Sequence, residues 1–320
     1  MSFIDRAWSR LACLMALAAI GFNSVPASAD NLAGSSLSLS VPTGTAPATC
    51  AVLASGAAVQ PLALNQTFFD DFHALQVSQL NGNGANWLGY YPYGSPLGLN
   101  NHTLGSNGEK EIYVYPVYAG SGTTPLNLNP FSYSNGVLSI TSTRTTTAQA
   151  ASLFNYPYYS GMLHSRNFFS QLYGYFEINA MLPKGYGTWP AFWLLPNNNA
   201  WPPEIDVLEI FGNNNNATMT THWKNAATKT NDMSACQFAV PTSMTAFHTY
   251  GALWTPTQVT YYVDRKPVAR IVPPAGATMP MYMLIDLAML SNTSLTGVYA
   301  APQSATMQVK WVAAYAATSY

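Results

Sequence analysis

The chain has 320 residues, of which 48% are hydrophobic, 13% aromatic and 8% charged, and its formal net charge is −1. This composition excludes intrinsic disorder, which requires low hydrophobicity and high net charge, and a coiled coil, which requires many Glu and Lys residues. Lys and Arg are few and form no cluster, so the sequence lacks the basic footprint of a nucleic-acid-binding protein, and we expect no nucleic-acid partner.

The first 29 residues have the features of a secretory signal peptide. Arg6 and Arg10 supply a positive start, and residues 11–22 form an apolar run shorter than the roughly 20 residues needed to span a bilayer. Residues 27–29, Ala-Ser-Ala, fit a cleavage site. We expect a mature chain that starts at Asp30, is secreted or periplasmic and has no membrane contact. An uncleaved membrane anchor is the alternative.

Residues 30–60 are rich in Ala, Ser, Gly and Thr. This composition predicts a linker or an N-terminal extension that is weakly ordered unless a covalent bond fixes it. Cys50 and Cys236 remain after removal of the signal, and in an exported protein they could form a disulfide. Because the sequence does not show whether they are close in space, the paired and unpaired forms both remain open.

From residue 61 to residue 320, short aromatic and β-branched runs alternate with turn residues, and no helical pattern of apolar residues extends beyond about ten residues. Such runs occupy residues 111–118, 136–142, 173–182, 258–263 and 306–312. Turn signals such as Asn135-Gly136 separate them. Many short strands with frequent turns predict an all-β fold, and the absence of an internal repeat favours one large sandwich domain over residues 61–320.

Three acids lie close together in a chain that has few. Apolar residues separate Glu204, Asp206 and Glu209, which indicates a buried strand on which side chains alternate between the two faces. Glu204 and Asp206 then share a face. Glu209 joins them only if a β-bulge near Val207-Leu208 adds one residue to the strand.

Three carboxyls on one face repel one another, which raises their pKa values until at least one holds a proton near neutral pH. Such a group suits acid–base chemistry, and two carboxyls about 5–5.5 Å apart are typical of a retaining glycosidase. Two other interpretations remain. One is an edge strand with solvated acids, which the intervening apolar residues disfavour. The other is a Ca²⁺ site helped by Asn213 to Asn216, which the strand setting disfavours.

The segment from Glu204 to Glu209 resembles the bulged E-x-D-x-x-E active-site motif of glycoside hydrolase family 16. Further segments resemble motifs of the same family in the same order, and together the resemblance covers about residues 65–315. These segments are Phe69 to Phe72, Tyr173 to Glu177 with Leu182 to Gly185, Gly187 to Pro196 with its W-P-A-F-W run, Phe247 to Tyr250 with Trp254, and Tyr262 to Asp264.

The resemblance implies a curved β-jelly-roll sandwich with an open substrate cleft on its concave face. It assigns Glu204 as the nucleophile, Glu209 as the acid/base and Asp206 as the carboxyl beside the nucleophile. The bulged motif is typical of the laminarinase-like, agarase and carrageenase branches, of which the resemblance favours the laminarinase-like one. The resemblance therefore points to a retaining endo-acting enzyme on β-linked polysaccharides, with β-1,3- or mixed β-1,3/1,4-glucan as the leading substrate.

The sequence departs from the family pattern in three places. Asn179 stands where the family often has Arg, and residues 286–291 replace a family stretch that contains two glycines, which weakens inference about the substrate at that edge of the cleft. Lys310 stands near an acid that helps some relatives bind a structural Ca²⁺. We therefore expect no cofactor and no metal.

Aromatic rings stack on the apolar faces of sugars, so aromatic residues near the motif are candidate substrate-binding residues. The candidates are Trp189 and Trp193 before the motif, His222 and Trp223 after it, and Trp87 in a region that could form a rim. We expect strand alternation to turn one of Trp189 and Trp193 inward, and at least one of them to line the cleft. Core packing is the alternative for the tryptophans, and a structural hydrogen bond is the alternative for His222.

The sequence therefore predicts a glycoside hydrolase that acts as a monomer on a polysaccharide. In the expected double displacement, Glu209 protonates the glycosidic oxygen while Glu204 attacks the anomeric carbon, and Glu209 then activates water. Three other functions remain open: a transglycosylase, an exopolysaccharide depolymerase of the same family, and a non-catalytic carbohydrate-binding sandwich. Low charge also leaves few salt bridges to lose in acid, so we expect tolerance of an acidic exterior.

Overall fold

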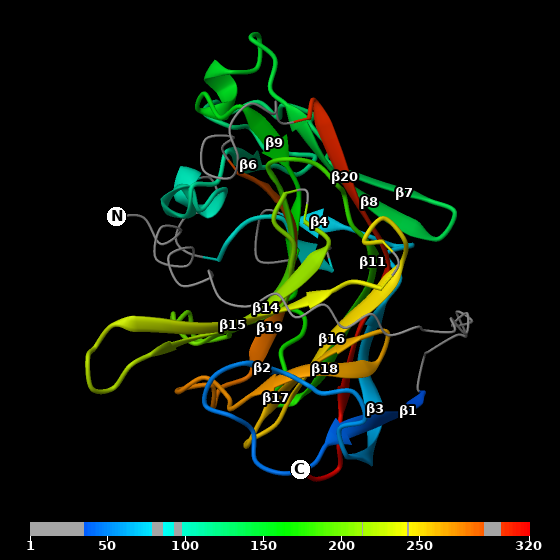
Figure 1. Cartoon of the computed structure of the whole chain (residues 1–320). Coiled ribbons are helices and arrows are strands. Elements are labelled where there is room, and N and C mark those ends of the chain that lie inside the picture. Colours follow the sequence, from blue (N-terminus) through cyan, green and yellow to red (C-terminus); the bar gives the residue numbers. More distant parts are fainter. Residues whose placement is uncertain (1–34, 79–85, 93–97, 213, 242, 291–301) are drawn as a thin grey trace.

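Two β-sheets packed face to face make up the molecule, as the computed structural model in Figure 1 shows. The structure describes residues 35–78, 86–92, 98–212, 214–241, 243–290 and 302–320. The expected signal peptide and the expected new N-terminus at Asp30 lie outside these residues. Within them, no helix is long and apolar enough to cross a membrane.

Within the described residues, the larger sheet has twelve strands. They are β1 (Ser36–Pro42), β2 (Ala51–Val52), β3 (Val59–Asp70), β6 (Glu111–Tyr113), β7 (Phe131–Ser134), β8 (Val137–Arg144), β9 (Tyr158–Ser160), β11 (Gly174–Met181), β16 (His248–Trp254), β17 (Val259–Val263), β18 (Lys266–Ile271) and β20 (Ser304–Ala316). Their main order is β2-β18-β17-β16-β11-β20-β8-β9-β6. In addition, β3 pairs with β20 and β1, and β7 pairs with β8.

The smaller sheet has eight strands in the part of the chain that the structure describes. They are β4 (Val77–Ser78), β5 (Trp87–Leu88), β10 (Met162–His164), β12 (Thr188–Pro196), β13 (Glu204–Glu209), β14 (Asn216–Lys224), β15 (Asn231–Ala239) and β19 (Met281–Met289). Their order is β15-β14-β13-β12-β19-β10-β5-β4. Three short 3₁₀ helices lie in the connections of the described chain, at Leu99–Asn101, Gly105–Asn107 and Ala151–Leu153.

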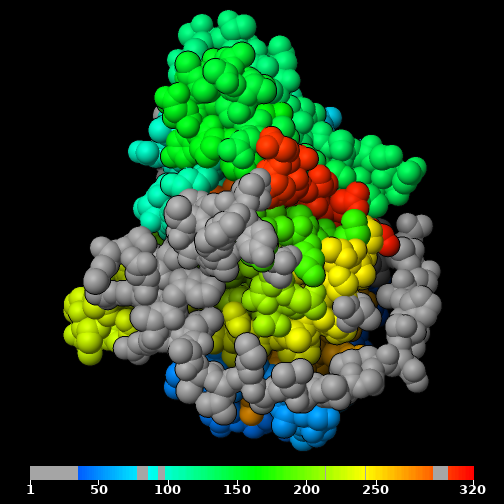
Figure 2. Space-filling model, turned by 45° about the horizontal axis from the view of Figure 1, so that its top comes forward, coloured from blue at the N-terminus to red at the C-terminus, as the bar shows by residue number. Residues whose placement is uncertain are grey.

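Two segments project beyond the sheets. The β14–β15 hairpin extends away from the body of the molecule (Figure 1). In the space-filling view, the green residues that lie between β6 and β9 in the sequence form a block at the upper end (Figure 2).

The central strands are apolar on both faces because each face is covered. On β12, Phe192 and Leu194 enter the main core between the sheets. Ala191, Trp193 and Leu195 alternate with them and lie in a separate apolar cluster on the other face of the smaller sheet. This double burial explains why β12 is a nearly continuous hydrophobic run rather than an alternating one.

The N-terminal segment belongs to the same fold. β1 pairs with β3, which runs without a break through the expected boundary at residue 60, and β2 pairs with β18. Leu39 and Val41 pack with Tyr262 in an apolar cluster on the outer face of the larger sheet. The sequence predicted weak order for residues 30–60 unless a covalent bond fixed them. Residues 35–60 pair with the larger sheet and cover an apolar surface that would otherwise face water, and the Cys50–Cys236 bond supplies the covalent link.

Cys50 and Cys236 form a disulfide, with their Cα atoms 5.5 Å apart. The bond joins the segment before β2 to the edge strand β15, and the Cys50 amide donates a hydrogen bond to Ser234 Oγ at 2.9 Å. Because β2 pairs with β18 of the other sheet, this segment ties the two sheets together. The residues it links are 186 positions apart, so the bond removes much of the freedom of the unfolded chain.

The predicted strands and turns correspond to elements of the structure. The runs named above overlap β6, β8, β11, β17 and β20. Asn135 and Gly136 join β7 to β8 with φ values of 52° and 74°, the positive values that two-residue hairpin turns require.

Candidate active site

The acidic motif forms β13, which has a β-bulge in its middle. The register against β14 shifts between Asp206 and Glu209, and Val207 and Leu208 both enter the main core. Two consecutive side chains on one face are what a bulge produces, so the predicted bulge is confirmed. Glu204, Asp206 and Glu209 consequently lie together on the opposite face. We refer to this side of the eight-stranded sheet as the acidic face.

Strand pairing extends the three acids into rows across the acidic face. Read from β14 through β13 to β12 and β19, the rows are Thr218–Glu209–Ala191–Asp286, Thr220–Asp206–Trp193–Leu284 and His222–Glu204. Directly opposed side chains in an antiparallel pair are close neighbours. Each acid of the motif therefore has one polar neighbour on β14.

Of the three carboxyls, Glu204 is the one in contact with an exposed aromatic ring. The Trp201 indole Nε1 donates to Glu204 Oε2 at 2.6 Å, and His222 Nε2 lies 3.7 Å from Glu204 Oε1. The Glu204 side chain is 14% exposed and Trp201 is 43% exposed. The indole N–H orients the carboxyl, and the remaining exposure leaves it accessible, which are properties that a nucleophile needs.

Glu209 has the properties of a general acid. Burial raises the pKa of its carboxyl to about 7; the charge of Glu204 acts in the same direction, while His222 and the Trp189 hydrogen bond oppose it. The Trp189 Nε1 group donates to Oε1 at 2.9 Å, and Thr220 Oγ1 donates to Oε2 at 3.4 Å. A carboxyl that still holds a proton near neutral pH can give it to a leaving group.

Asp206 lies between the other two acids and is 3% exposed. Burial raises its pKa well above the usual range, and the charges of Glu204 and Glu209 add to the effect. Asp206 Oδ2 and His222 Nε2 share a hydrogen bond of 3.0 Å. Since the three carboxyls interact strongly, their protons belong to the group as a whole rather than to single residues.

Trp189 and Trp193 both lie on the acidic face. The expectation that one of them turns inward is wrong, because a separation of four residues returns a strand to the same side. Trp189 is half-buried beside Phe211, with ring centroids 5.0 Å apart. Trp193 is 8% exposed and donates its Nε1 hydrogen to Asp286 Oδ1 at 2.6 Å.

The other predicted substrate-binding residues separate in the structure. His222 lies on the acidic face, whereas Trp223, the next residue of β14, points to the opposite side. Trp87 is fully buried, packs against Phe72 and donates to Asp70 Oδ2 at 2.7 Å. Trp87 is therefore a core residue in this structure, which is the alternative that the sequence left open.

Sequence reasoning missed three neighbours of the acids: Trp201, Thr220 and Asp286. Trp201 precedes Glu204 by three residues, so an aromatic residue next to the motif was the available signal. Asp286 is the one acid in the otherwise apolar β19, where it is 4% exposed. An isolated acid in an apolar strand is a signal for a buried polar function. Thr220 gave no signal, because its role depends on strand register.

A second group of buried acids lies beyond Asp286. Glu109 and Glu111 are 4% and 0% exposed and accept backbone hydrogen bonds from Leu104 at 2.9 Å and Met289 at 2.6 Å. Burial raises the pKa of Glu109 well above the usual range and that of Glu111 to about 7. Burial, with the charge of Glu109, raises the pKa of Asp286 to about 8.

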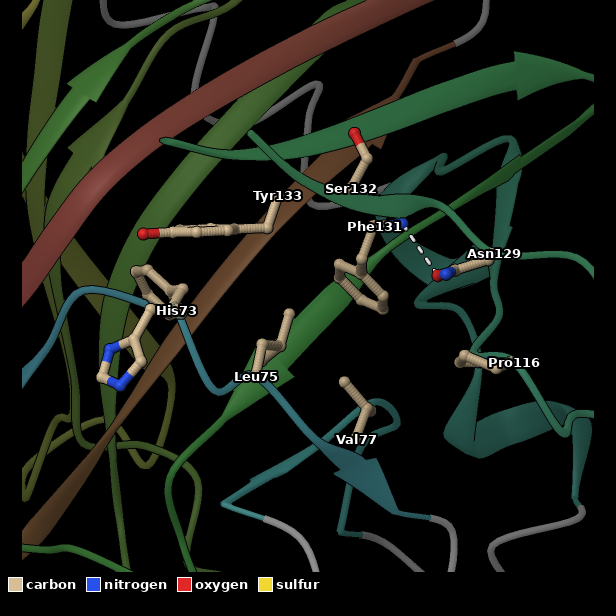
Figure 3. Close-up of a pocket in the computed structure, with 9 residues that line it drawn as sticks. His73, Leu75, Val77, Pro116, Asn129, Phe131, Ser132 and Tyr133 are labelled. Carbon is tan, nitrogen blue, oxygen red and sulfur yellow. Dashed lines mark hydrogen bonds between the residues drawn. The ribbon is translucent and has the colours of Figure 1, made fainter. Parts of the chain in front are cut away.

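Two further features of the described residues bear on ligands. Ligand atoms of Glu204, Asp206 and His222 lie within 4.8 Å of one another, so these residues could hold a divalent cation. The acid–base chemistry of the same carboxyls needs no cation. A hollow has a volume of about 190 Å³. Figure 3 shows Leu75 and Phe131 pointing into it beside Tyr133 and His73. Its lining residues include no acid, so this hollow is separate from the acidic face.

Comparisons with known proteins show the family and the fold of the chain. The profile of the family described as glycosyl hydrolases family 16 matches residues 127–313. The chain belongs to glycoside hydrolase family 16. It is similar to the catalytic domain of an endo-1,3-beta-glucanase (laminarinase) from Thermotoga petrophila RKU-1, with a TM-score of 0.59 and 20% identity over 80% of this chain and 99% of that one. The expected jelly-roll sandwich is confirmed.

Two curated relatives have a higher identity than this laminarinase structure. The chain is 37% identical over 255 residues to the endo-1,3-1,4-beta-glycanase ExsH, and 38% identical over 255 residues to the endo-1,3-1,4-beta-glycanase EglC, both of Rhizobium meliloti (strain 1021). Each match covers 79% of this chain and 52% of the relative. The chain therefore spans about half the length of these curated relatives.

The buried carboxyls predict how stability depends on pH. Asp206, Glu209, Asp286, Glu109 and Glu111 all have folded pKa values above the value of about 4 that they have when unfolded. Above that value the folded state still holds these protons while the unfolded state has lost them. The free energy of unfolding therefore falls as pH rises from about 4 through about 7 for Glu209 and Glu111, and through about 8 for Asp286.

Urea unfolding across the pH range from acid to mildly alkaline measures this effect. We expect the midpoint to be highest in mild acid and to fall toward alkaline pH. Asp286→Asn, which has no proton to lose, should flatten the alkaline part of the curve. A midpoint that rises steadily from mild acid to alkaline pH would contradict the assignment of raised pKa values.

Proposed function

We propose that this family 16 chain is a retaining endo-β-glycanase that hydrolyses β-1,3- or mixed β-1,3/1,4-glucan. The observation that carries the proposal is the placement of three carboxyls on one bulged strand in unlike environments. Glu204 accepts an indole N–H from the exposed Trp201, whereas the half-buried Glu209 has a carboxyl whose pKa is raised to about 7, so that it holds a proton near neutral pH. One ionised and one protonated carboxyl on the same face are what double displacement requires.

In the first step, the protonated Glu209 donates its hydrogen to the glycosidic oxygen while a Glu204 oxygen attacks the anomeric carbon. The bond to the leaving sugar breaks, and a glycosyl ester forms on Glu204. The Trp189 N–H and the Thr220 hydroxyl stabilise the carboxylate that remains on Glu209. Both groups are donors, so they support Glu209 most strongly after it has given up its proton.

In the second step, Glu209 accepts a proton from water, and the resulting hydroxide attacks the same anomeric carbon. The ester bond to Glu204 breaks and the sugar leaves with its original configuration. Asp206 and His222 form a hydrogen-bonded pair beside Glu204 throughout. This pair limits the charge that accumulates next to the nucleophile as the ester forms and breaks.

The substrate class rests on relatives and on the chemistry of the acidic face. The two curated relatives described above are named as endo-1,3-1,4-beta-glycanases. Trp201 and Trp189 offer aromatic rings next to Glu204 and Glu209, and sugars stack on such rings. A neutral glucan also avoids the repulsion that an anionic polymer would meet from the carboxyls.

We also propose that the protein is exported. The features of residues 1–29 support this, and so does the Cys50–Cys236 disulfide, which is a bond of oxidising compartments. Protein recovered from outside the cytoplasm should begin at Asp30 and show no free thiol when titrated under denaturing conditions. An N-terminus at Met1, or two free thiols, would contradict export with cleavage.

Substitution of the two glutamates tests the reaction. Glu204→Gln removes the nucleophile and Glu209→Gln removes the proton donor, so each should lower kcat on a soluble β-1,3-glucan by a factor of about 10²–10⁴. Proton NMR of the first wild-type product should show the β-anomer, with the α-anomer appearing later by mutarotation. Asp232→Asn, an acid of β15 next to the hairpin turn, is the matched control and should keep full activity.

Two outcomes would overturn the assignment: a first product of α configuration, or full activity in either glutamate variant. Sizing of the products in the presence of acceptor oligosaccharides separates hydrolysis from transglycosylation. A hydrolase gives fragments no longer than the substrate, whereas a transglycosylase gives longer chains.

A further inference from the structure

Asp286 is a buried acid that the proposed reaction does not use. It lies on β19 within the apolar run M-Y-M-L-I-D-L-A-M and is 4% exposed. In strand register it faces the acidic side two strands from Glu209, with only the small Ala191 between them on β12. A charged group in such a strand is costly to bury unless it is satisfied, so its contacts should have a function.

Both oxygens of Asp286 accept hydrogen bonds from aromatic side chains. Trp193 Nε1 donates to Oδ1 at 2.6 Å, and the Tyr113 hydroxyl donates to Oδ2 at 3.2 Å. Trp193 in turn lies directly opposite Asp206 on β13, and its ring meets the edge of Tyr91 with centroids 6.2 Å apart. Asp286 therefore fixes the rotamer of the Trp193 indole, which lies beside Asp206.

We propose that Asp286 is a positioning residue of the glycanase, which holds the Trp193 indole against Asp206 of β13 so that Asp206 stays buried and the neighbouring Glu209 keeps its reactive arrangement. The proposal rests on the glycanase function proposed above. Asp286 touches neither sugar nor reacting atoms in this account and acts through Trp193. Its hydrogen bond decides where the ring lies, and the ring decides how much water reaches the carboxyls of β13.

The protonation of Asp286 depends on the other titratable groups that face it. One group lies on β6 and the segments before it: Tyr91, Glu109, Glu111 and Tyr113. A second group is the three acids of β13, Glu204, Asp206 and Glu209. Two histidines lie on the same face, His164 on β10 and His222 on β14. Burial and the charges of Glu109 and Glu204 raise the pKa of Asp286 to about 8. At neutral pH it is therefore a neutral hydrogen-bonding group, which asparagine imitates.

Kinetics of four variants test the positioning role. Asp286→Ala frees the indole, so kcat should fall about tenfold, the factor that corresponds to the loss of one hydrogen bond. KM should change little, because an indole that is 8% exposed offers little surface to a sugar. Trp193→Phe should show a similar loss, and the double variant should lose no more than either single one, since the two residues act as one unit. Asp286→Asn should stay close to wild type at pH 6.

Glu111→Gln is the matched control. Glu111 is a buried carboxyl of the same neighbourhood, yet it bonds the Met289 amide rather than Trp193. We expect this variant to keep the wild-type kcat. If Glu111→Gln loses as much activity as Asp286→Ala, the effect belongs to buried acids in general and the positioning role of Asp286 is wrong.

Indole NMR gives a readout that does not depend on turnover. In protein labelled with ¹⁵N-tryptophan, the Trp193 Nε1–H signal is identified by its absence from Trp193→Phe. It should move with pH with a midpoint of about 8 in the wild type, and should stay in place across that range in Asp286→Asn. A folded Asp286→Ala variant should show a displaced or broadened signal, because the indole has lost its acceptor.

The kinetic and the NMR readouts distinguish failure of the glycanase function from failure of the positioning role. If no glycan is hydrolysed but the Trp193 signal titrates as expected, the glycanase function fails and the Asp286–Trp193 contact stands. If the glycanase is active but folded Asp286→Ala keeps the wild-type kcat, or the Trp193 signal titrates in Asp286→Asn as in wild type, the positioning proposal is overturned.

Discussion

The site depends on two consecutive core residues. Val207 and Leu208 both enter the space between the sheets, and a regular strand cannot turn neighbouring side chains to one side. The extra residue that this requires moves Glu209 onto the face that already holds Glu204 and Asp206. Hydrophobic packing on one side of β13 thus places the three carboxyls on the other side, and the core maintains a repulsion that the acids alone would relieve by separating.

The surroundings of the acids then give each one a different role. Glu204 accepts a hydrogen bond from the exposed Trp201, Glu209 accepts one from the half-buried Trp189, and the buried Asp206 lies between them with His222 as its partner. The chain has 13 acidic residues in all, and three of them lie within positions 204–209. Concentrating so much charge in a buried site explains why protons are retained there and why the fold should favour acid over alkaline conditions. The sequence predicted acid tolerance from scarce salt bridges, whereas the structure supports it through retained protons.

Much of the fold was predictable because its signals are local. Short apolar runs, turn pairs such as Asn135-Gly136 and the spacing of the motif all act within a few residues, and the bulge followed from the position of Val207-Leu208. Features set by pairing between distant strands were not predictable. Asp286 lies in the same cross-strand row as Glu209, with Ala191 between them. Strand register brings Thr220 into contact with Glu209. The N-terminal segment packs on an apolar surface that includes Tyr262, which is distant in the chain. The sequence left Trp87 open between the substrate rim and core packing for the same reason, since its partner Asp70 lies on another element.

The central claim is that burial and a neighbouring carboxylate keep Glu209 protonated near neutral pH. Carbon NMR of protein with ¹³C-labelled glutamate carboxyls measures this directly, with Glu209→Gln used to assign the signal. In the wild type, Glu209 should titrate with a pKa of about 7, and in Glu204→Gln the midpoint should fall, because the neighbouring negative charge is gone. A Glu209 midpoint near the ordinary value for glutamate, unchanged by Glu204→Gln, would contradict the account.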